Sequence, residues 1–331
     1  MTMRIETSNI PNSNYIEMYN RLSSHKNILF AVHVNADGDC IGSALALALH
    51  FQERGHTVSI YSRDLVPDNC KFLPGTELVT NELPNNIEQM VIVFIDAEGE
   101  KRCGFLHGSV DSAGKKLRID HHLAETKEGI FTLQDTEAAA TGEIIFSLFK
   151  ANNIEITADM ATQLFTAIQV DTTRYLNNNT TYKSYEISAE LVRLGANRKL
   201  IVEKLYNSTN FSVVKLLGMA LSRTELAVSD RVIYAYLTRE DFRAADASPS
   251  DTEGIIDRLK SVETAEVALL FTEKSSEIKV SIRTREGSID ANEFAKIWSG
   301  GGHKRAAGMS VVGVPLKSAI SEVLTKLSMI M

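Results

Sequence analysis

Six side chains of the kinds that bind metal ions stand in four short segments of this chain. Each follows closely on an apolar run, and in an α/β protein the carboxyl ends of neighbouring parallel strands meet along one crevice. Carboxylate oxygens gathered with imidazoles at such an edge are typical of a two-metal site rather than of scattered surface charge. The six residues are His33, Asp37, Asp39, Asp96, His121 and Asp171.

The first of these segments, H-V-N-A-D-G-D (33–39), places two carboxylates around a glycine. Asp37 and Asp39 can face the same way only if the backbone bends between them, and Gly38 permits such a bend. A helix expected over 41–54 would add the positive charge of its N-terminal end, which favours an anionic substrate. Taken alone, the segment also fits an Asp-Gly turn in which Asp39 caps the helix.

The other three segments carry the remaining groups. Asp96 follows the apolar run V-I-V-F-I, and a carboxylate at the end of a buried strand needs a cap, a partner or a metal. In Asp120-His121-His122 the adjacent histidines point in different directions, so one can bind a metal while the other faces a substrate. Asp120 could orient a histidine by accepting its ring proton. Asp171 ends an apolar helical stretch. For Asp96 alone, a loop-capping role is the simpler alternative.

The elements that must position these groups follow an α/β order. Continuous apolar and β-branched runs predict the strands of a parallel sheet, and the strand–helix–strand order at the start predicts a βαβ unit. The expected strands cover 27–34, 57–62, 90–95, 116–119 and 129–133. Helical periodicity predicts further helices over 141–152, 157–170 and 181–195.

The second half of the chain has a different character. After N-S-T-N-F (207–211) the pattern predicts a smaller, mixed α/β domain. Its expected elements are helices over 212–227 and 251–261 and strands over 231–237, 266–272 and 278–284, the last two forming an antiparallel hairpin. We therefore expect a first domain over 14–190, a linker over 191–211 and a second domain over 212–331.

The overall composition restricts the partners and the compartment. A net charge of −7 in 331 residues argues against a protein that coats long nucleic acid, which requires a basic surface, but it allows a small anionic substrate. Cys40, Cys70 and Cys103 are widely spaced and odd in number, which is typical of reduced, buried thiols in a cytoplasmic protein. With no signal-peptide pattern and no apolar run near about 18 residues, we expect no membrane span.

A glycine run near the C-terminal end is the candidate for substrate binding. Residues 300–302 carry no Cβ atoms, so their backbone N–H groups could form a nest for an anion beside His303. The small residues that follow, A-A-G (306–308), suit tight packing. Arg283, in the expected strand I-K-V-S-I-R, could grip a phosphate with two donors. Each signal is weak alone, because a glycine run is usually a flexible loop and a strand arginine is often a surface charge.

Together these segments resemble the DHH phosphoesterases. The resemblance runs from about Asn14 to the C-terminus. Four segments carry it in order: H-V-N-A-D-G-D-C-I-G-S (33–43), F-I-D (94–96), I-D-H-H (119–122) and V-D-T-T-R-Y (170–175). Near the C-terminus, S-I-R-T (281–284) and G-G-G-H-K-R-A-A-G (300–308) resemble the DHH-associated domain. The domain sizes are similar to those of nanoRNases, adenosine bisphosphate (pAp) phosphatases and cyclic-di-AMP or pApA phosphodiesterases.

The resemblance implies a role for each candidate ligand. Two divalent cations, Mn²⁺ or Mg²⁺, would share a hydroxide that attacks phosphorus. His122 would stabilise or protonate a substrate oxygen, with Asp120 beside it. Ala36 and Thr173 depart from the family pattern, which often has proline and glycine there, and Thr173 could tighten the mouth of the substrate site. The implied ligand sets are His33 and Asp37 for the first metal, Asp39, His121 and Asp171 for the second, and Asp96 for both.

The resemblance also implies the substrate. Short oligoribonucleotides such as pApA would be hydrolysed to nucleoside 5′-monophosphates, with pAp as a further substrate, in a cleft between the two domains. Substrate binding would fall to Arg283, Gly301, Gly302 and His303. Members of the family often form homodimers, and the sequence is compatible with one. Three alternatives stay open at this point: a RecJ-like single-strand exonuclease, a pyrophosphatase of the same superfamily, and a nucleotide-binding sensor that has lost catalysis.

Overall fold

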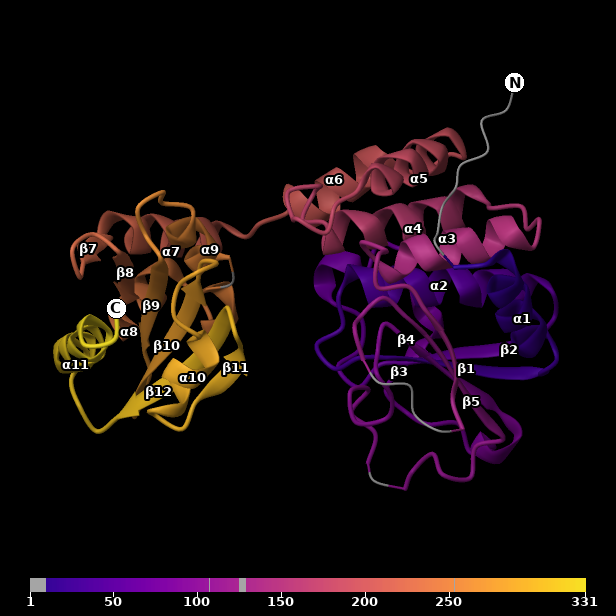
Figure 1. The fold of residues 1–331 in the computed structure, drawn as a ribbon, viewed down its shortest axis with the longest axis horizontal. Coiled ribbons are helices and arrows are strands. Elements are labelled where there is room, and N and C mark those ends of the chain that lie inside the picture. The colour runs from indigo at the N-terminus through magenta and orange to yellow at the C-terminus, as the bar shows by residue number, and fades with distance from the viewer. Residues whose placement is uncertain (1–9, 107, 125–128, 253) are drawn as a thin grey trace. The chain divides into compact units, whose positions relative to one another are not determined.

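A division between Ser208 and Thr209 separates the chain into two units (Figure 1). The computed structural model describes residues 10–106, 108–124, 129–252 and 254–331. The division falls inside the stretch 191–211 that the sequence assigned to a linker. However, α6 (Arg198–Tyr206) occupies much of that stretch and buries Ile201 in the core of the first unit. This part of the stretch is therefore a packed helix and not a linker.

The described strands of the first unit run parallel, as the sequence predicts, in the order β3-β2-β1-β4-β5-β6. The chain moves outward in one direction from β1 to β3 and in the other from β4 to β6. The carboxyl ends of β1 and β4 therefore flank the crevice in which polar groups gather in such sheets. The strands are β1 (Asn27–Val32), β2 (Thr57–Tyr61), β3 (Val79–Thr80), β4 (Val91–Ile95), β5 (Lys115–Asp120) and β6 (Phe131–Gln134).

Helices cover one face of this sheet in layers (Figure 1). α2 and α3 contact the sheet, α4 packs on both of them, and α5 and α6 lie on the outer side of α4. Alternate residues of β1 serve the two faces, since Phe30 joins the core under the helices and Leu29 joins a second core that includes loop residues such as Cys103. Besides α6, the helices described in this unit are α1 (Asn12–Ser23), α2 (Gly38–Glu53), α3 (Thr141–Ala151), α4 (Ala158–Asp171) and α5 (Tyr182–Arg193).

Two local details around α2 differ from the prediction. The helix begins at Gly38, earlier than expected, because Oδ1 of Asp37 accepts hydrogen bonds from the backbone N–H groups of Asp39 (3.0 Å) and Cys40 (3.1 Å). The helix cap is therefore Asp37 and not Asp39. Gly38 does not provide a bend. A Cβ atom there would lie 2.5 Å from Val170 Cγ2, so the glycine allows α2 to approach α4 closely.

The second unit has a mixed sheet in the order β11-β12-β10-β9-β8-β7. β8 and β9 are parallel, whereas the other neighbouring strands are antiparallel, including the predicted β9–β10 hairpin. The strands are β7 (Glu225–Ala227), β8 (Val232–Leu237), β9 (Val267–Glu273), β10 (Glu277–Thr284), β11 (Gly301–His303) and β12 (Ala306–Val312). These elements match the predicted mixed α/β fold.

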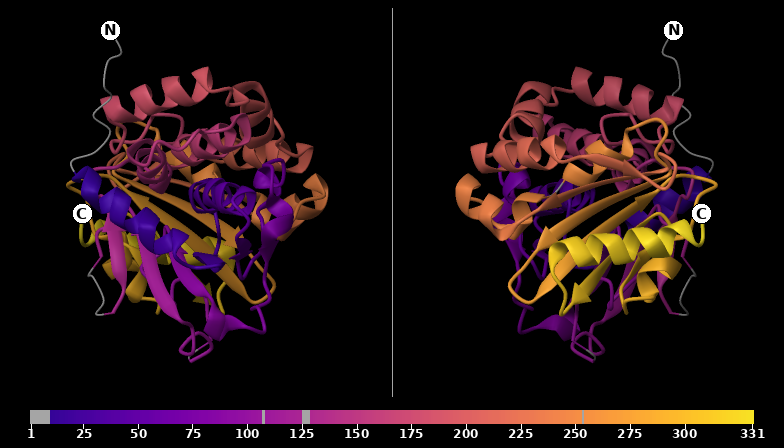
Figure 2. Two further views of the ribbon diagram at one scale, coloured as in Figure 1. Left: turned by 90° about the vertical axis from the view of Figure 1, so that its right-hand side faces the viewer. Right: turned by 90° about the vertical axis from the view of Figure 1, so that its left-hand side faces the viewer.

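Helices lie on both faces of this second sheet. α11, drawn in yellow, crosses one face together with α10 (Figure 2, right), and α7, α8 and α9 contribute to the core on the other. Two predicted helices are shorter in the structure. Residues 225–227 leave the expected helix to pair with β8, and Gly254, at φ +78°, precedes a short α9. The helices are α7 (Phe211–Ser222), α8 (Arg239–Ala245), α9 (Ile255–Lys260), α10 (Ala291–Lys296) and α11 (Leu316–Ser328).

Short 3₁₀ turns complete the secondary structure, at Asp68–Cys70, Thr76–Leu78, Ile87–Gln89 and Pro249–Thr252. Across the described ranges, no helix combines the length and hydrophobicity needed to cross a membrane.

Candidate metal centre

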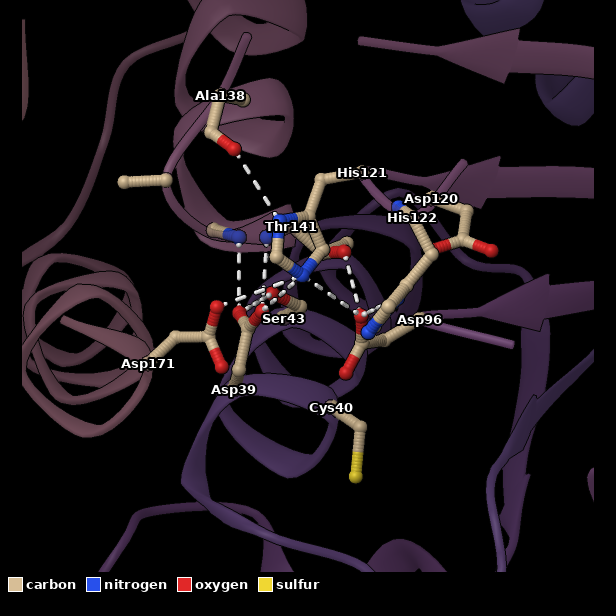
Figure 3. Close-up of polar contacts among 12 residues, drawn as sticks. Asp39, Cys40, Ser43, Asp96, Asp120, His121, His122, Ala138, Thr141 and Asp171 are labelled. Carbon is tan, nitrogen blue, oxygen red and sulfur yellow. Dashed lines mark hydrogen bonds and ion pairs between the residues drawn. The ribbon is translucent and has the colours of Figure 1, made fainter. Parts of the chain in front are cut away.

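The structure brings the six candidate ligands together at the carboxyl ends of the central strands. Figure 3 shows four of them: Asp39, Asp96, His121 and Asp171. His33 follows β1, which ends at Val32 and is shorter than predicted, and Asp96 follows β4. His121 follows β5, and Asp171 is the last residue of α4. Among the described residues, ligand atoms within 4.8 Å of one another form three sets: His33, Asp37 and Cys40; Asp39, His121 and Asp171; Asp96, His121 and His122.

The imidazole of His121 directs its Nε2 at three carboxylates. Its Nδ1 lies 3.1 Å from the Ala138 carbonyl oxygen, which can only accept, so Nδ1 is the donor in this contact. Nε2 faces Asp171 Oδ2 (3.4 Å), Asp96 Oδ1 (3.5 Å) and Asp39 Oδ2 (4.0 Å). Nε2 is buried and has no hydrogen-bond partner within the described part of the chain. A buried imidazole nitrogen and carboxylate oxygens gathered within 4.8 Å of one another form the donor set of a metal ion, so these groups fit one.

His33 repeats this arrangement on the other side of Asp96. Its Nδ1 lies 2.9 Å from the Val34 carbonyl oxygen, and its Nε2 faces Asp96 Oδ2 (3.4 Å) and Asp37 Oδ1 (3.7 Å). Burial lowers the pKa of His33, but hydrogen bonding to Asp37 and Asp96 outweighs burial, so the pKa lies well above its ordinary value. The metal-free ring therefore holds a proton, which a bound cation would displace.

Asp96 is the carboxylate that both histidines share. It is buried, and one of its oxygens faces His33 while the other faces His121. Burial raises the pKa of Asp96, but hydrogen bonds from His122 and His33 lower it by more, so the carboxylate is ionised. Its φ of +55° is left-handed, a conformation that a non-glycine residue keeps only where its surroundings hold it. With one oxygen toward each imidazole, the side chain suits a ligand shared by two cation positions.

Asp39 is completely buried but well supplied with hydrogen-bond donors. Its Oδ1 accepts from the Gly142 N–H (3.0 Å) and the Ser43 hydroxyl (3.2 Å), and its Oδ2 accepts from the Thr141 N–H (2.8 Å) (Figure 3). Burial raises the pKa of Asp39 well above its ordinary value, and the charge of Asp96 adds to this effect. The donors fix the side chain, while the raised pKa indicates a carboxylate that a nearby cation would stabilise.

Asp171 lies at the rim of the cluster. Burial raises its pKa to about 6, although its side chain remains 27% exposed. The next turn is unusual, because Thr173, Arg174 and Tyr175 have φ values of +47°, +60° and +64°. A residue with a Cβ atom adopts this left-handed backbone conformation only at a cost in free energy, whereas glycine adopts it without that cost. The conformation accounts for the glycine that the family often has at the position of Thr173.

His122 has different partners from those of His121. Asp120 Oδ1 accepts from the His122 backbone N–H (3.0 Å) and lies 2.9 Å from its Nδ1. The other oxygen of Asp120 accepts from the guanidinium of buried Arg118 (2.8 Å). Hydrogen bonding to Asp120 and then to Asp96 raises the pKa of His122 to about 10. His122 is therefore a cation at neutral pH, and its side chain is 55% exposed beside the cluster.

The predicted anion nest at residues 300–302 does not form. Gly301–His303 is the edge strand β11, and the Gly302 N–H donates to Oδ1 of Asn292 (3.0 Å). Gly302 has a φ of +151°, and a Cβ atom there would lie 2.5 Å from the Ala306 carbonyl oxygen. This glycine therefore serves the close pairing of β11 with β12.

Arg283 and His303 nevertheless share one face of the second sheet. Both pair in register with Ala306 of β12, and directly opposed residues project to the same face. Arg283 and His303 therefore flank a small residue. Arg283 is partly exposed, and its Nε lies 3.3 Å from Asp257 Oδ1.

The next row of this face consists of small residues. Gly301 pairs with Gly308, and Gly308 pairs with Ser281. A Cβ atom at Gly301 or Gly308 would come no closer than 3.7 Å or 3.9 Å to another group. Neither of these two glycines is required by its neighbours. The tight packing expected at residues 306–308 is instead against Gly300 and Gly302, since a Cβ atom at Gly300 would overlap the Gly308 carbonyl oxygen.

Sequence reasoning missed the residues that support the cluster. Arg118 reads as an ordinary strand residue, yet it is buried against Asp120. For Thr141 and Gly142 the sequence predicts only the start of a helix. A helix start indicates donors for a carboxylate, because the first N–H groups of a helix lack intrahelical acceptors.

The cysteines behave as the sequence predicts. Cys40, Cys70 and Cys103 are free and buried. Cys40 lies in a candidate ligand set, but burial raises the pKa of its thiol. Its Sγ accepts from the Asp37 backbone N–H (3.3 Å) in the cap of α2, so we assign Cys40 a structural role.

Comparisons with known proteins agree on one family. A model described as the DHH family, N-terminal domain, matches residues 27–168, and a DHHA1 domain model matches residues 229–331. Over 298 residues the chain is 30% identical to the bifunctional oligoribonuclease and PAP phosphatase NrnA of Thermus thermophilus, which covers 90% of this chain and 88% of that protein.

Solved structures give the same picture of the fold. An exopolyphosphatase-related protein from Bacteroides fragilis matches with a TM-score of 0.85 at 25% identity, covering 100% of this chain and 99% of that one. The exonuclease RecJ bound to manganese matches with a TM-score of 0.55 at 14% identity, covering 97% and 95% of the two chains.

Proposed function

Because the chain belongs to the DHH family and is a phosphoric ester hydrolase by that membership, we propose that it hydrolyses short oligoribonucleotides. The products would be nucleoside 5′-monophosphates from substrates such as pApA, and AMP from pAp. The relative named an oligoribonuclease and PAP phosphatase supports this substrate class. One observation carries the proposal: His33 and His121 direct Nε2 at opposite oxygens of the buried Asp96.

The cluster would hold two divalent cations. Mixed imidazole and carboxylate ligands favour Mn²⁺ over Mg²⁺, which prefers oxygen and water. When bound, such cations lower the pKa of a water and offset the charge of phosphoryl oxygens. The proposed ligands are His33 and Asp37 for one cation, Asp39, His121 and Asp171 for the other, and Asp96 for both.

His122 is the proposed partner of the substrate oxygens. With a pKa raised to about 10 by Asp120 and Asp96, its ring is an imidazolium that can donate a hydrogen bond or a proton to the leaving oxygen. Asp120 fixes the ring through Nδ1, and Arg118 fixes Asp120. The proton donor would therefore be oriented before substrate binds.

The second unit would hold the far end of the substrate through Arg283, Gly301, Gly302 and His303. The side chains of Arg283 and His303 flank a floor of small residues on one face of the sheet. A planar base or sugar can lie on such a floor, while the guanidinium pairs with a terminal phosphate. Substrate binding would replace the weak, partly exposed contact of Arg283 with Asp257.

The test is a substrate panel on the metal-stripped full chain, with and without Mn²⁺. We expect Mn²⁺-dependent cleavage of pApA and a five-mer RNA to monophosphates, and of pAp to AMP. Absence of all three activities under every metal condition would contradict the proposal. Tight nucleotide binding without cleavage would favour a sensor. Preferential degradation of long single strands would favour a RecJ-like exonuclease, and cleavage of pyrophosphate alone would favour a pyrophosphatase.

A further inference from the structure

The segment that leads into α3, residues 138–143, holds ligands from three different parts of the chain (Figure 3). Each of its contacts is a hydrogen bond of ordinary length to a buried or partly buried group. The contacts are the Ala138 carbonyl with His121 Nδ1 (3.1 Å), the Thr141 N–H with Asp39 Oδ2 (2.8 Å), the Gly142 N–H with Asp39 Oδ1 (3.0 Å), and the Thr141 hydroxyl with Asp96 Oδ1 (3.0 Å).

Local features of the sequence make this segment rigid. The carboxylate of Glu143 accepts the Ala139 N–H (3.1 Å), which closes the segment on itself. A Cβ atom at Gly142 would lie 2.6 Å from Ala167 Cβ, so glycine lets α3 begin close against α4. The N–H groups of Thr141 and Gly142 have no acceptor inside the helix and carry the positive end of its dipole, which suits the buried Asp39 carboxylate that they bind.

Thr141 differs from the rest of the segment because it holds two ligands at once. Its N–H binds Asp39 and its hydroxyl binds Asp96, and the residue is completely buried. We propose that Thr141 is a positioning residue that fixes the separation of Asp39 and Asp96, and through them the spacing of the two cation positions. This inference rests on the proposed function for the presence of the cations.

The test replaces the hydroxyl and keeps the shape. Thr141→Val retains the backbone N–H and the side-chain volume but leaves Asp96 without this donor. We expect Mn²⁺ affinity, measured by calorimetric titration of the metal-free full chain, to fall about 10- to 100-fold. Thr141→Ser keeps the donor and should return the affinity to near the wild-type value. The electron paramagnetic resonance signal of a coupled Mn²⁺ pair should weaken in Thr141→Val and return in Thr141→Ser.

The matched control is Thr166→Val. Thr166 is also a buried threonine, but its hydroxyl donates to the Thr162 carbonyl (2.8 Å) in its own helix. This variant should bind Mn²⁺ like the wild type. If Thr141→Val fails to fold by circular dichroism, Thr141→Ala removes the same hydroxyl with less crowding and takes its place.

The outcomes separate this inference from the proposed function. Wild-type Mn²⁺ affinity in the hydroxyl-free variant would overturn the role of Thr141, and so would a wild-type chain that binds no Mn²⁺. Weakened Mn²⁺ binding in Thr141→Val, in a protein whose wild type does not cleave pApA, would uphold the positioning role and overturn the proposed function alone.

Discussion

The two units present their polar residues in opposite ways. In the first unit, Asp39, Asp96 and Asp120 are buried at the ends of parallel strands or a helix start. Donors from the start of α3 hold Asp39 and Asp96, and Arg118 of its own strand holds Asp120. In the second unit, Arg283 and His303 stand on one face of a mixed sheet, and Arg283 has an ion pair with Asp257 that is partly exposed.

This difference separates a fixed centre from an adaptable surface. Buried carboxylates that share donors cannot move independently, so geometry that catalysis needs is built in before substrate arrives. Exposed side chains lose little when they change partner, which suits recognition of substrates of different length. Changes in the first unit should therefore act on cation binding and turnover, and changes in the second on substrate affinity.

Loss of a proposed ligand should have the largest effect. We expect Asp171→Asn to reduce kcat/KM for pApA by at least about 10³-fold, because a cation held without one charged ligand loses several kcal/mol of charge stabilisation and each 1.36 kcal/mol is tenfold in rate. Asp159→Asn is the matched control, since Asp159 is an exposed carboxylate on the first turn of the same helix. Equal activity in the two variants would remove Asp171 from the ligand set.

The buried ion pair of the first unit should be the next most sensitive. Arg118→Met removes the buried cation of the two that face Asp120, the other being His122, and should lower the free energy of unfolding of the first unit by about 3–5 kcal/mol. The matched pair in the second unit, Arg223 with Asp241, is more exposed. Arg223→Met should therefore lower the free energy of unfolding of the second unit by about 1–3 kcal/mol.

One optical probe distinguishes these two variants. Trp298 is the sole tryptophan and lies in the second unit, so its fluorescence in a urea titration reports that unit. The transition of Trp298 should shift in Arg223→Met and stay unchanged in Arg118→Met, whose loss should appear in circular dichroism. An equal shift of Trp298 fluorescence in both variants would argue against separate responses of the two units.

Loss of the proposed phosphate contact should have a smaller effect of a different kind. We expect Arg283→Ala to raise KM for pApA about 10- to 100-fold, the value of a charge-assisted hydrogen bond, with a smaller change in kcat. Lys279→Ala removes a neighbouring exposed cation from the same face of β10 and should change neither constant appreciably. A fall in kcat at constant KM would instead put Arg283 in the reaction chemistry.

The smallest effect should be a pH dependence of stability in the metal-free chain. The pKa of His122 is raised from 6.5 to about 10 by Asp120 and Asp96, so the folded state holds a proton that the unfolded state loses. The stability from His122 is fully present below pH 6.5 and is lost as the pH rises through about 10. The melting temperature of the wild type should therefore fall faster than that of His122→Gln between pH 7 and 9.5. Parallel curves would contradict the assigned partners of His122.

The sequence predicted the candidate site where residue type and strand polarity were sufficient. An apolar run followed by Asp96, or by Asp120 and the two histidines, indicates a strand whose carboxyl end carries polar groups, and parallel pairing brings such ends together. The parallel sheet of the first unit and the β9–β10 hairpin of the second were confirmed as well, because apolar and β-branched runs mark their strands. The roles of the site residues themselves stay predictions.

The parts that the sequence could not supply depend on backbone groups and close packing. The N–H groups of Thr141 and Gly142 reach Asp39 through the backbone, so the sequence signals a helix start there but not its partner. Glycine likewise has the same letter when it opens an anion site and when it fits against a neighbouring strand, as Gly302 does. Tertiary contacts, rather than local propensity, decided these positions.

The central claim is that the cluster around Asp96 binds two cations and that both are needed for hydrolysis. Its most direct test is a Mn²⁺ titration of the metal-free full chain, with bound metal and pApA cleavage measured on the same samples. The account predicts two Mn²⁺ bound per chain, with cleavage appearing as the second is taken up. Binding of one ion or none, or cleavage that precedes metal uptake, would contradict it.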